Sequence, residues 1–257
     1  TKNVTTTGAS GSATTTAPTE VKVSGTTATV TVTKENAAEM VKQATENKSA
    51  EIVLRVSAAD TKNAEMVKLQ LETSVVKDVV NKTSADLTVE TPNGTVTLEK
   101  EILSQAVSEG NGSTITLEVI GVKKPTAEQK KAAGENAHVI QLVLKSGNKV
   151  ISLFNKGQAT VKVEIPARLK DKKVAAVHIG DDYTLEQLAG KVITEGAKKF
   201  YEFTTPHFST FALVDADEVG LEVEEPQTDV KALTAKLTPV ARSAKTAKKN
   251  VKVTVSL

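Results

Sequence analysis

Two stretches of the sequence share one pattern: TVTVTKENAAEMV at residues 29–41 and TVTLEKEILSQAV at residues 95–107. Each begins with alternating apolar and polar residues, the period of a β-strand, and continues with apolar residues three and four positions apart, the period of an α-helix. Each is followed by a short strand pattern, AEIVLRV (50–56) and STITLEV (113–119) respectively. The sequence therefore predicts a strand–helix–strand unit that occurs in both places.

A third unit of the same kind lies between these two. Here VKLQLE (67–72) leads into TSVVKDVVNKT (73–83) and then into ADLTVE (85–90). Thr33 is a candidate N-cap of the first helix. Pro92-Asn93-Gly94 is a hairpin signal between the predicted strands at residues 85–90 and 94–98. The similarity of the units indicates an internal repeat, although short amphipathic patterns can also converge.

These units define the first of two expected domains. Residues 20–122 are predicted to form an α+β domain of strand–helix–strand repeats, whose sheet is either parallel or mixed. Residues 123–136 are polar and contain Pro and Gly, so we expect a linker that includes at most a turn of helix. Residues 137–214 are almost wholly strand patterns separated by turn residues, which favours an antiparallel β-sandwich. The fold class predicted is thus mainly β with short helices (α+β).

The two ends of the sequence have biased compositions. Residues 1–19 are mostly Thr, Ser, Ala and Gly, and they predict a flexible linker because they offer few apolar side chains to offset the entropy of ordering. Residues 215–228 are acidic and are interpreted as a second linker. Residues 229–257 are basic and are expected to be either a partial module or a tail that folds back.

Composition excludes several functional classes. The 257 residues carry 33 Lys and Arg against 31 Asp and Glu, and this balance gives no basic excess for a nucleic-acid backbone. With no Cys, the chain forms no disulfide, no Cys-ligated metal centre and no thiol nucleophile. No apolar run approaches the length of a membrane span. We therefore expect no nucleic-acid partner, no membrane insertion and no cofactor.

The histidines are the main candidates for chemistry. His138, His178 and His207 show no close His-x-x-x-His spacing, so no metal site is expected. His207 and Ser209 lie two apart, which on a strand places both on one face and suggests a hydrolase. Ser209 is not in a Gly-x-Ser-x-Gly turn, so we assign His207 and Ser209 a structural role at the start of the last strand and expect no catalytic residues.

Aromatic residues are scarce, at 3% of the chain with no Trp. Protein sites for sugars commonly use exposed aromatic rings, and the two tyrosines, Tyr183 and Tyr201, are the candidate ligand-binding residues. Phe200 and Tyr201 are adjacent on a predicted strand and so point to opposite faces, which leaves one of them able to face solvent.

Several stretches resemble a module of Gram-positive bacterial cell-surface proteins, found beside S-layer-homology, bacterial Ig-like or fibronectin-type repeats. They are TAEQKKAAGENAHVIQLVLKSGNKVISLF (126–154), ATVKVEIPARL (159–169), VAAVHIGDD (174–182) and FTTPHFSTFALV (203–214). SAEIVLRVSAAD (49–60) and ADLTVETPNGTVTLEKE (85–101) resemble its N-terminal companion. The resemblance implies an extracellular, wall-attached location and no assigned activity.

Three functions remain as hypotheses. The first is a non-enzymatic structural or adhesive module of a cell-surface protein that acts as a spacer or scaffold beside other modules of the same polypeptide. The second is a carbohydrate- or glycoprotein-binding module with cell-wall or host glycans as partners. The third, a small hydrolase using His207 and Ser209, would require an acid behind the histidine.

Overall fold

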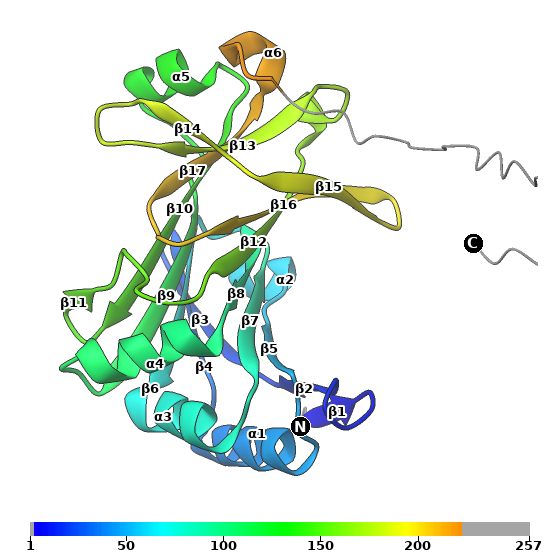
Figure 1. Cartoon of the computed structure of the whole chain (residues 1–257), viewed down its shortest axis with the longest axis vertical. Coiled ribbons are helices and arrows are strands. Elements are labelled where there is room, and N and C mark those ends of the chain that lie inside the picture. The colour runs from blue at the N-terminus through cyan, green and yellow to red at the C-terminus, as the bar shows by residue number, and fades with distance from the viewer. Residues whose placement is uncertain (1–2, 223–257) are drawn as a thin grey trace, which may run out of the picture. The chain divides into compact units, whose positions relative to one another are not determined.

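The alternating apolar pattern folds into two mixed β-sheets within residues 3–222, the part of the chain that the computed structural model describes (Figure 1). The first sheet has the order β1 (Thr5–Thr7), β2 (Thr14–Ala17), β5 (Glu51–Arg55), β7 (Asp86–Thr91), β8 (Gly94–Leu98), β12 (Ala159–Glu164), β16 (Lys198–Thr205) and β15 (Gly190–Glu195). The second has the order β14 (Leu185–Leu188), β13 (Val174–Ile179), β17 (Thr210–Asp215), β10 (His138–Ser146), β9 (Thr114–Gly121), β6 (Met66–Glu72), β4 (Thr27–Thr31) and β3 (Glu20–Ser24). A short strand β11 (Lys149–Val150) also pairs with β10.

The predicted strand–helix–strand units are present as elements, and each one crosses from one sheet to the other. The helix α1 (Lys34–Glu46) joins β4 to β5, α3 (Thr73–Lys82) joins β6 to β7, and α4 (Lys100–Glu109) joins β8 to β9. As predicted, Thr33 caps α1, because its hydroxyl accepts a hydrogen bond from the backbone N–H of Asn36 at 3.2 Å. Both sheets are mixed, with β2–β5, β5–β7 and β4–β6 as the parallel pairs.

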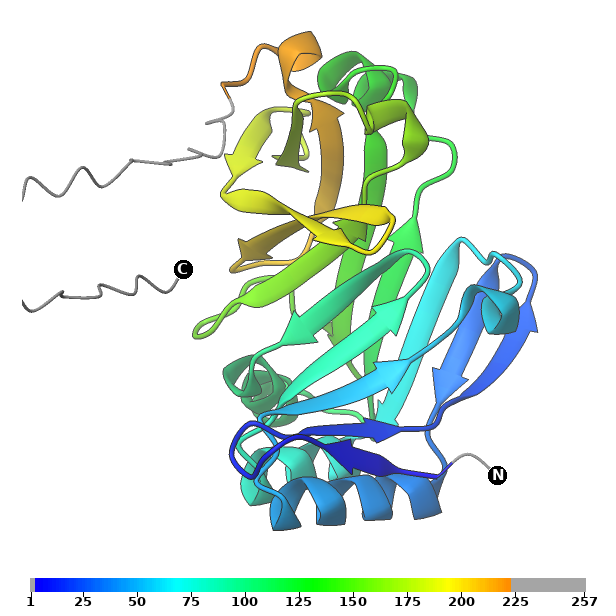
Figure 2. The same ribbon diagram turned by 90° about the vertical axis from the view of Figure 1, so that its right-hand side faces the viewer.

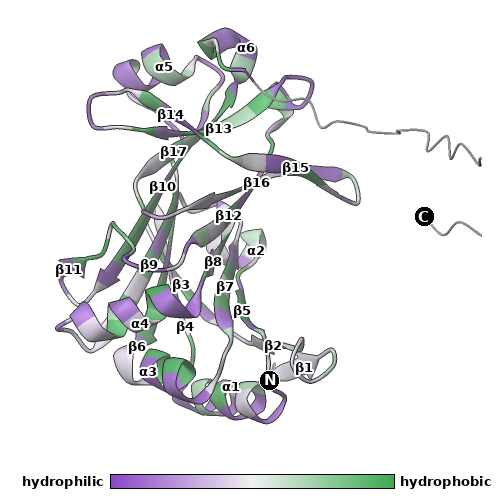
Figure 3. Ribbon diagram, viewed as in Figure 1, coloured by the Kyte–Doolittle hydropathy of each residue, from purple (hydrophilic) through white to green (hydrophobic). Residues whose placement is uncertain are grey.

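One hydrophobic core lies between the two sheets. It includes Leu54 and Phe203 from the first sheet together with Leu117 and Phe211 from the second. The helices α1, α3 and α4 lie together at one end of the sheets (Figure 2) and add apolar residues such as Met40 to the same core. Hydrophobic and hydrophilic residues alternate along many strands, as Figure 3 shows, because successive side chains face opposite sides of a sheet.

A second, smaller core covers the other face of the second sheet. Alternate residues of the same strands, such as Val139 and Val177, pack there with Ala133 of α5 (Ala127–Ala133) and Ala216 of α6 (Ala216–Val219). This part of the sheet is therefore buried on both faces. Double burial explains why β13 is apolar nearly throughout instead of alternating.

The expected flexible linker at residues 1–19 is wrong for the described part of that segment. Its residues form β1 and β2, and β2 pairs in parallel with β5. Thr15 is fully buried and its hydroxyl lies 2.9 Å from that of Thr6 and 2.8 Å from that of Ser49. The prediction failed because β-branched threonine is itself a good strand residue once an existing sheet edge supplies hydrogen-bond partners.

The expected division into two domains at residues 123–136 also differs from the structure. The described residues 3–222 all belong to one compact unit, and the boundary segment contains α5. Strands from both sides of it pair directly, β8 with β12 and β9 with β10. Hydrogen-bonded ladders across the proposed boundary leave no place for a linker between independent domains.

The fold class is confirmed as mainly β with short helices. The other helical elements are α2 (Ala58–Thr61) and the short 3₁₀ helix η1 (Ala167–Leu169).

The strands β14 and β15 were not predicted from the sequence of residues 137–214. Residues 215–222, which were expected to begin an acidic linker, contain the last residue of β17 and the helix α6. The rest of that linker and the basic segment 229–257 lie outside the described residues. Within residues 3–222, none of the helices has both the length and the apolar character to cross a membrane.

Candidate functional site

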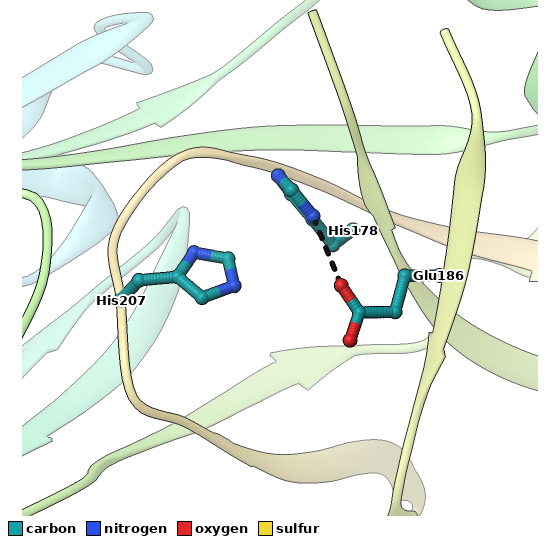
Figure 4. Close-up of side chains that lie close together, drawn as sticks. All are labelled: His178, Glu186 and His207. Carbon is teal, nitrogen blue, oxygen red and sulfur yellow. Dashed lines mark ion pairs between the residues drawn. The ribbon is translucent and has the colours of Figure 1, made fainter.

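Two polar side chains face each other across the hairpin of β13 and β14. His178 and Glu186 are directly opposite in the antiparallel register, so their side chains lie on the same face of the sheet. The Nδ1 atom of His178 is 3.5 Å from the Oε2 atom of Glu186, as the dashed line in Figure 4 marks. The histidine side chain is 20% exposed and the glutamate 71%, so the carboxylate is at the solvent edge of the pair.

His207 reaches the same place from the loop between β16 and β17. Backbone hydrogen bonds hold this loop to a neighbouring segment, from Phe154 N–H to the Pro206 carbonyl at 2.9 Å and from Phe208 N–H to the Ser152 carbonyl at 2.7 Å. The Thr205 hydroxyl also donates to the His207 carbonyl at 2.8 Å. The loop backbone is therefore fixed on both sides of His207.

The two histidines are in direct ring contact. Their centroids are 4.6 Å apart in an edge-to-face arrangement with an interplanar angle of 67°. Phe211 of β17 packs against both rings at 5.8 Å. Because Phe211 is itself fully buried, one side of the histidine pair is anchored on the main core.

Ser209 completes this group. Its Oγ atom is 3.2 Å from the Nε2 atom of His178. Glu186, His178 and Ser209 therefore place a carboxylate, an imidazole and a hydroxyl next to one another in that order. The hydrolase alternative paired Ser209 with His207, whereas the β13–β14 hairpin places His178 beside the Ser209 hydroxyl.

The surroundings keep His207 uncharged. Burial and the neighbouring His178 lower the pKa of His207 below its ordinary value of 6.5, while Glu186 acts in the opposite direction. At neutral pH the imidazole is therefore neutral and carries a lone pair on one ring nitrogen. A neutral imidazole is the form that binds a metal ion.

A hollow of about 430 Å³ opens beside these residues. It is lined by His178, His207, Ser209, Ser152, Leu153, Asp181 and Phe208. Leu153 is 63% exposed, so the hollow has an apolar rim next to its polar side chains. A water molecule or small ligand has direct access to the histidine pair.

The candidate tyrosines lie elsewhere and differ from each other. Tyr183 is 42% exposed at the turn between β13 and β14, with a backbone φ of 63°. Tyr201 is only 4% exposed and belongs to the main core, so its assignment as a ligand-binding residue is wrong. The alternation of β16 instead turns Phe200 outward, where the Nζ atom of Lys162 lies 5.2 Å from the ring centroid.

The role of His178 and Glu186 in this site was not predicted, although one sequence signal was present. VAAVHI (174–179) and LEQL (185–188) flank the turn-rich GDDYT (180–184), the pattern of a β-hairpin. Recognition of that hairpin would have placed His178 and Glu186 opposite each other. The approach of His207 follows from tertiary packing, which local spacing does not encode.

No protein-family model matches the chain, and a search of curated proteins finds no significant match.

Proposed function

We propose that residues 3–222 are a non-enzymatic structural module of a bacterial cell-surface protein, acting as a spacer or scaffold. The observation that carries this proposal is the placement of β1 and α6 at opposite ends of the unit in both views (Figures 1 and 2). The chain thus enters and leaves the unit at separate ends, as a spacer requires. The resemblance of residues 126–154 and 203–214 to surface-protein modules supports the extracellular location.

Strand pairing that continues through both sheets allows the module to resist extension. β12 is paired on both sides, with β8 and β16, and β10 is paired with β9 and β17. The first and second halves of the sequence are therefore joined by backbone hydrogen bonds in both sheets. A load along the unit would be shared by these ladders and by the core between them.

A distance measurement in solution tests the spacer proposal. The natural chain has no Cys, so Thr5→Cys and Asp217→Cys introduce two unique, exposed sites for spin labels. We expect a single narrow distance distribution by pulsed electron paramagnetic resonance, and a broad one for the same sample in urea. A broad or multiple distribution under native conditions would contradict a spacer of fixed length.

A second candidate function is recognition of a carbohydrate or glycoprotein. The observation in its favour is a hollow of about 620 Å³ beside Phe200, lined mainly by polar and charged residues including Arg55, Glu90, Lys162 and Lys198. An aromatic ring among hydrogen-bonding groups is suited to sugar binding. Charged groups that line this hollow pair with one another, as Lys162 does with Glu195 at 2.8 Å. Because these groups already have partners within the protein, they are less available to a sugar, and the structural role is favoured.

A binding screen separates the two functions. The purified chain is tested against cell-wall preparations, mucin and a glycan panel, with Phe200→Ala and Tyr183→Ala as comparison variants. The structural role predicts no saturable binding. Saturable binding that is lost in Phe200→Ala would replace it with the recognition function.

A further inference from the structure

Three potential ligand atoms converge at the histidine pair. His178, Glu186 and His207 each offer one nitrogen or oxygen atom, and these atoms all lie within 4.8 Å of one another. Figure 4 shows a ring nitrogen of His207 on the side that faces His178 and Glu186. The residues come from β13, β14 and the β16–β17 loop, so their proximity is a product of the tertiary fold.

Ser209 is placed to control the proton on His178. When its hydroxyl accepts the Nε2–H of His178, the imidazole keeps its lone pair on Nδ1. That lone pair then faces the Glu186 carboxylate, 3.5 Å away. Two acceptors that face each other repel unless a proton or a cation lies between them, and a bound cation would satisfy both.

We propose that His178, Glu186 and His207 bind a divalent transition-metal ion of the zinc class, and that Ser209 is a positioning residue for His178. Two imidazole nitrogens and one carboxylate oxygen form a donor set that suits zinc and related ions, whereas calcium and magnesium prefer oxygen donors throughout. A hydrogen bond to the second ring nitrogen is the usual way in which a metal-binding histidine is oriented. This inference goes beyond the structural role proposed above.

The three side chains can bring their ligand atoms close enough together to bind one ion. Tetrahedral zinc, with bonds of about 2.0–2.1 Å, separates its ligand atoms by roughly 3.3 Å, which is closer than the 4.8 Å limit of the present cluster. Glu186 is 71% exposed, so its side chain is free to rotate inward while the anchored histidines stay in place. His178 and His207 line the hollow, so water can reach their side of the site.

The charges around the cluster favour a cation. Asp181 lines the same hollow as His178 and His207, so it adds a second carboxylate beside the histidine pair. The two imidazoles therefore lie beside carboxylates that attract a cation.

Isothermal titration calorimetry with ZnCl₂ tests the proposal on the full chain, prepared without a histidine tag and treated with a chelator. We expect one saturable site per chain. Titration with Co²⁺ gives a second readout, because four-coordinate cobalt with nitrogen ligands has intense visible absorption bands. No saturable binding of either ion would overturn the proposal.

Variants identify the ligands. We expect His207→Asn to weaken zinc binding at least about 100-fold and to remove the cobalt bands. Ser209→Ala should weaken it about 10-fold, as expected for an outer-shell partner, and Ser209→Thr should restore it. Glu128→Gln on α5 and His138→Asn on β10 are matched controls that should keep wild-type affinity.

Folding is checked by urea unfolding of each variant without metal, so that loss of binding is not confused with loss of structure. Glu186→Gln is the second ligand variant, because an exposed side chain is changed without altering its size. Wild-type affinity in both His207→Asn and Glu186→Gln would overturn the assignment of these ligands.

Discussion

Phe203 and Phe211 lie in contact across the core, with ring centroids 5.5 Å apart. Phe203 belongs to β16 of the first sheet and Phe211 to β17 of the second. Both side chains are almost completely buried, at 2% and 0% exposure. This contact is part of the core that joins the two sheets, and Phe211 also packs against both histidine rings, so it contributes to the stability of the unit and to the geometry of the candidate site.

Truncation of this contact should destabilise the whole unit. We expect Phe211→Ala to lower the free energy of unfolding by about 3–5 kcal/mol, because it removes a large buried side chain and leaves a cavity. Urea unfolding followed by circular dichroism measures the change. Val192→Ala, at a residue that is 51% exposed, is the control and should change stability by less than about 0.5 kcal/mol. Equal stability of the two variants would contradict the packing described.

The threonine-rich N-terminal segment should be ordered in solution. The backbone of β2 pairs with β5 on one side and with β1 on the other, so the ladder-bonded amide protons between Thr14 and Ala17 should exchange slowly with solvent. Hydrogen exchange followed by mass spectrometry or NMR tests this, with the exposed turn at Gly196 as a rapidly exchanging reference. Immediate exchange throughout residues 5–17 would restore the interpretation as a flexible linker.

His138 should make the protein less stable in acid. Burial, with a smaller contribution from Arg168, lowers the pKa of His138 below 6.5 in the folded state. The unfolded chain then binds the proton more readily, so this stability is present above pH 6.5 and is lost as the pH falls toward the lowered pKa. Urea midpoints at several pH values measure it.

The control for this effect is His138→Asn, which has no titrating group at that position. His207, whose pKa is also lowered, contributes in the same direction and remains in the control. The variant should therefore lose less stability than the wild type between pH 7.5 and pH 5. An equal or steeper loss in His138→Asn would contradict the assignment.

Ser209 is not expected to react as a catalytic nucleophile. The distance of 3.5 Å between His178 Nδ1 and Glu186 Oε2 exceeds that of an ordinary hydrogen bond, and the exposed carboxylate is solvated. A fluorophosphonate probe should leave Ser209 unmodified by mass spectrometry, while a known serine hydrolase in the same reaction is labelled. Labelling that is lost in His178→Asn would instead indicate an acid–imidazole–hydroxyl catalytic group.

The sequence contained the local structure but not the way in which the units join. Between Thr27 and Gly121, periodicity located the strands and the helices α1, α3 and α4 but not the short helix α2. The Thr33 cap follows from local hydrogen bonding. A local pattern carries no information on partners, however. The crossing of each unit between two sheets and the pairing of β8 with β12 depend on which strands complete the core.

The candidate site shows the same limit. His207 and Ser209 were singled out by their separation on one strand, but their partner His178 comes from β13 and the carboxylate from β14. Tyr201 was a candidate because its identity suits a binding surface, yet the alternation of β16 places it in the core. Side-chain chemistry suggested candidates, and packing decided which of them are accessible.

Residues 3–222 should unfold as one mechanical unit, and force spectroscopy on the full chain, held between two reference modules, tests this directly. We predict that the described 220 residues (222 − 3 + 1) unfold in a single step. The gain in contour length should be roughly 70–80 nm, at about 3.3–3.6 Å per residue, less the end-to-end distance of the folded unit. Two separate steps, each of roughly half that length, would show two independent domains and contradict the account.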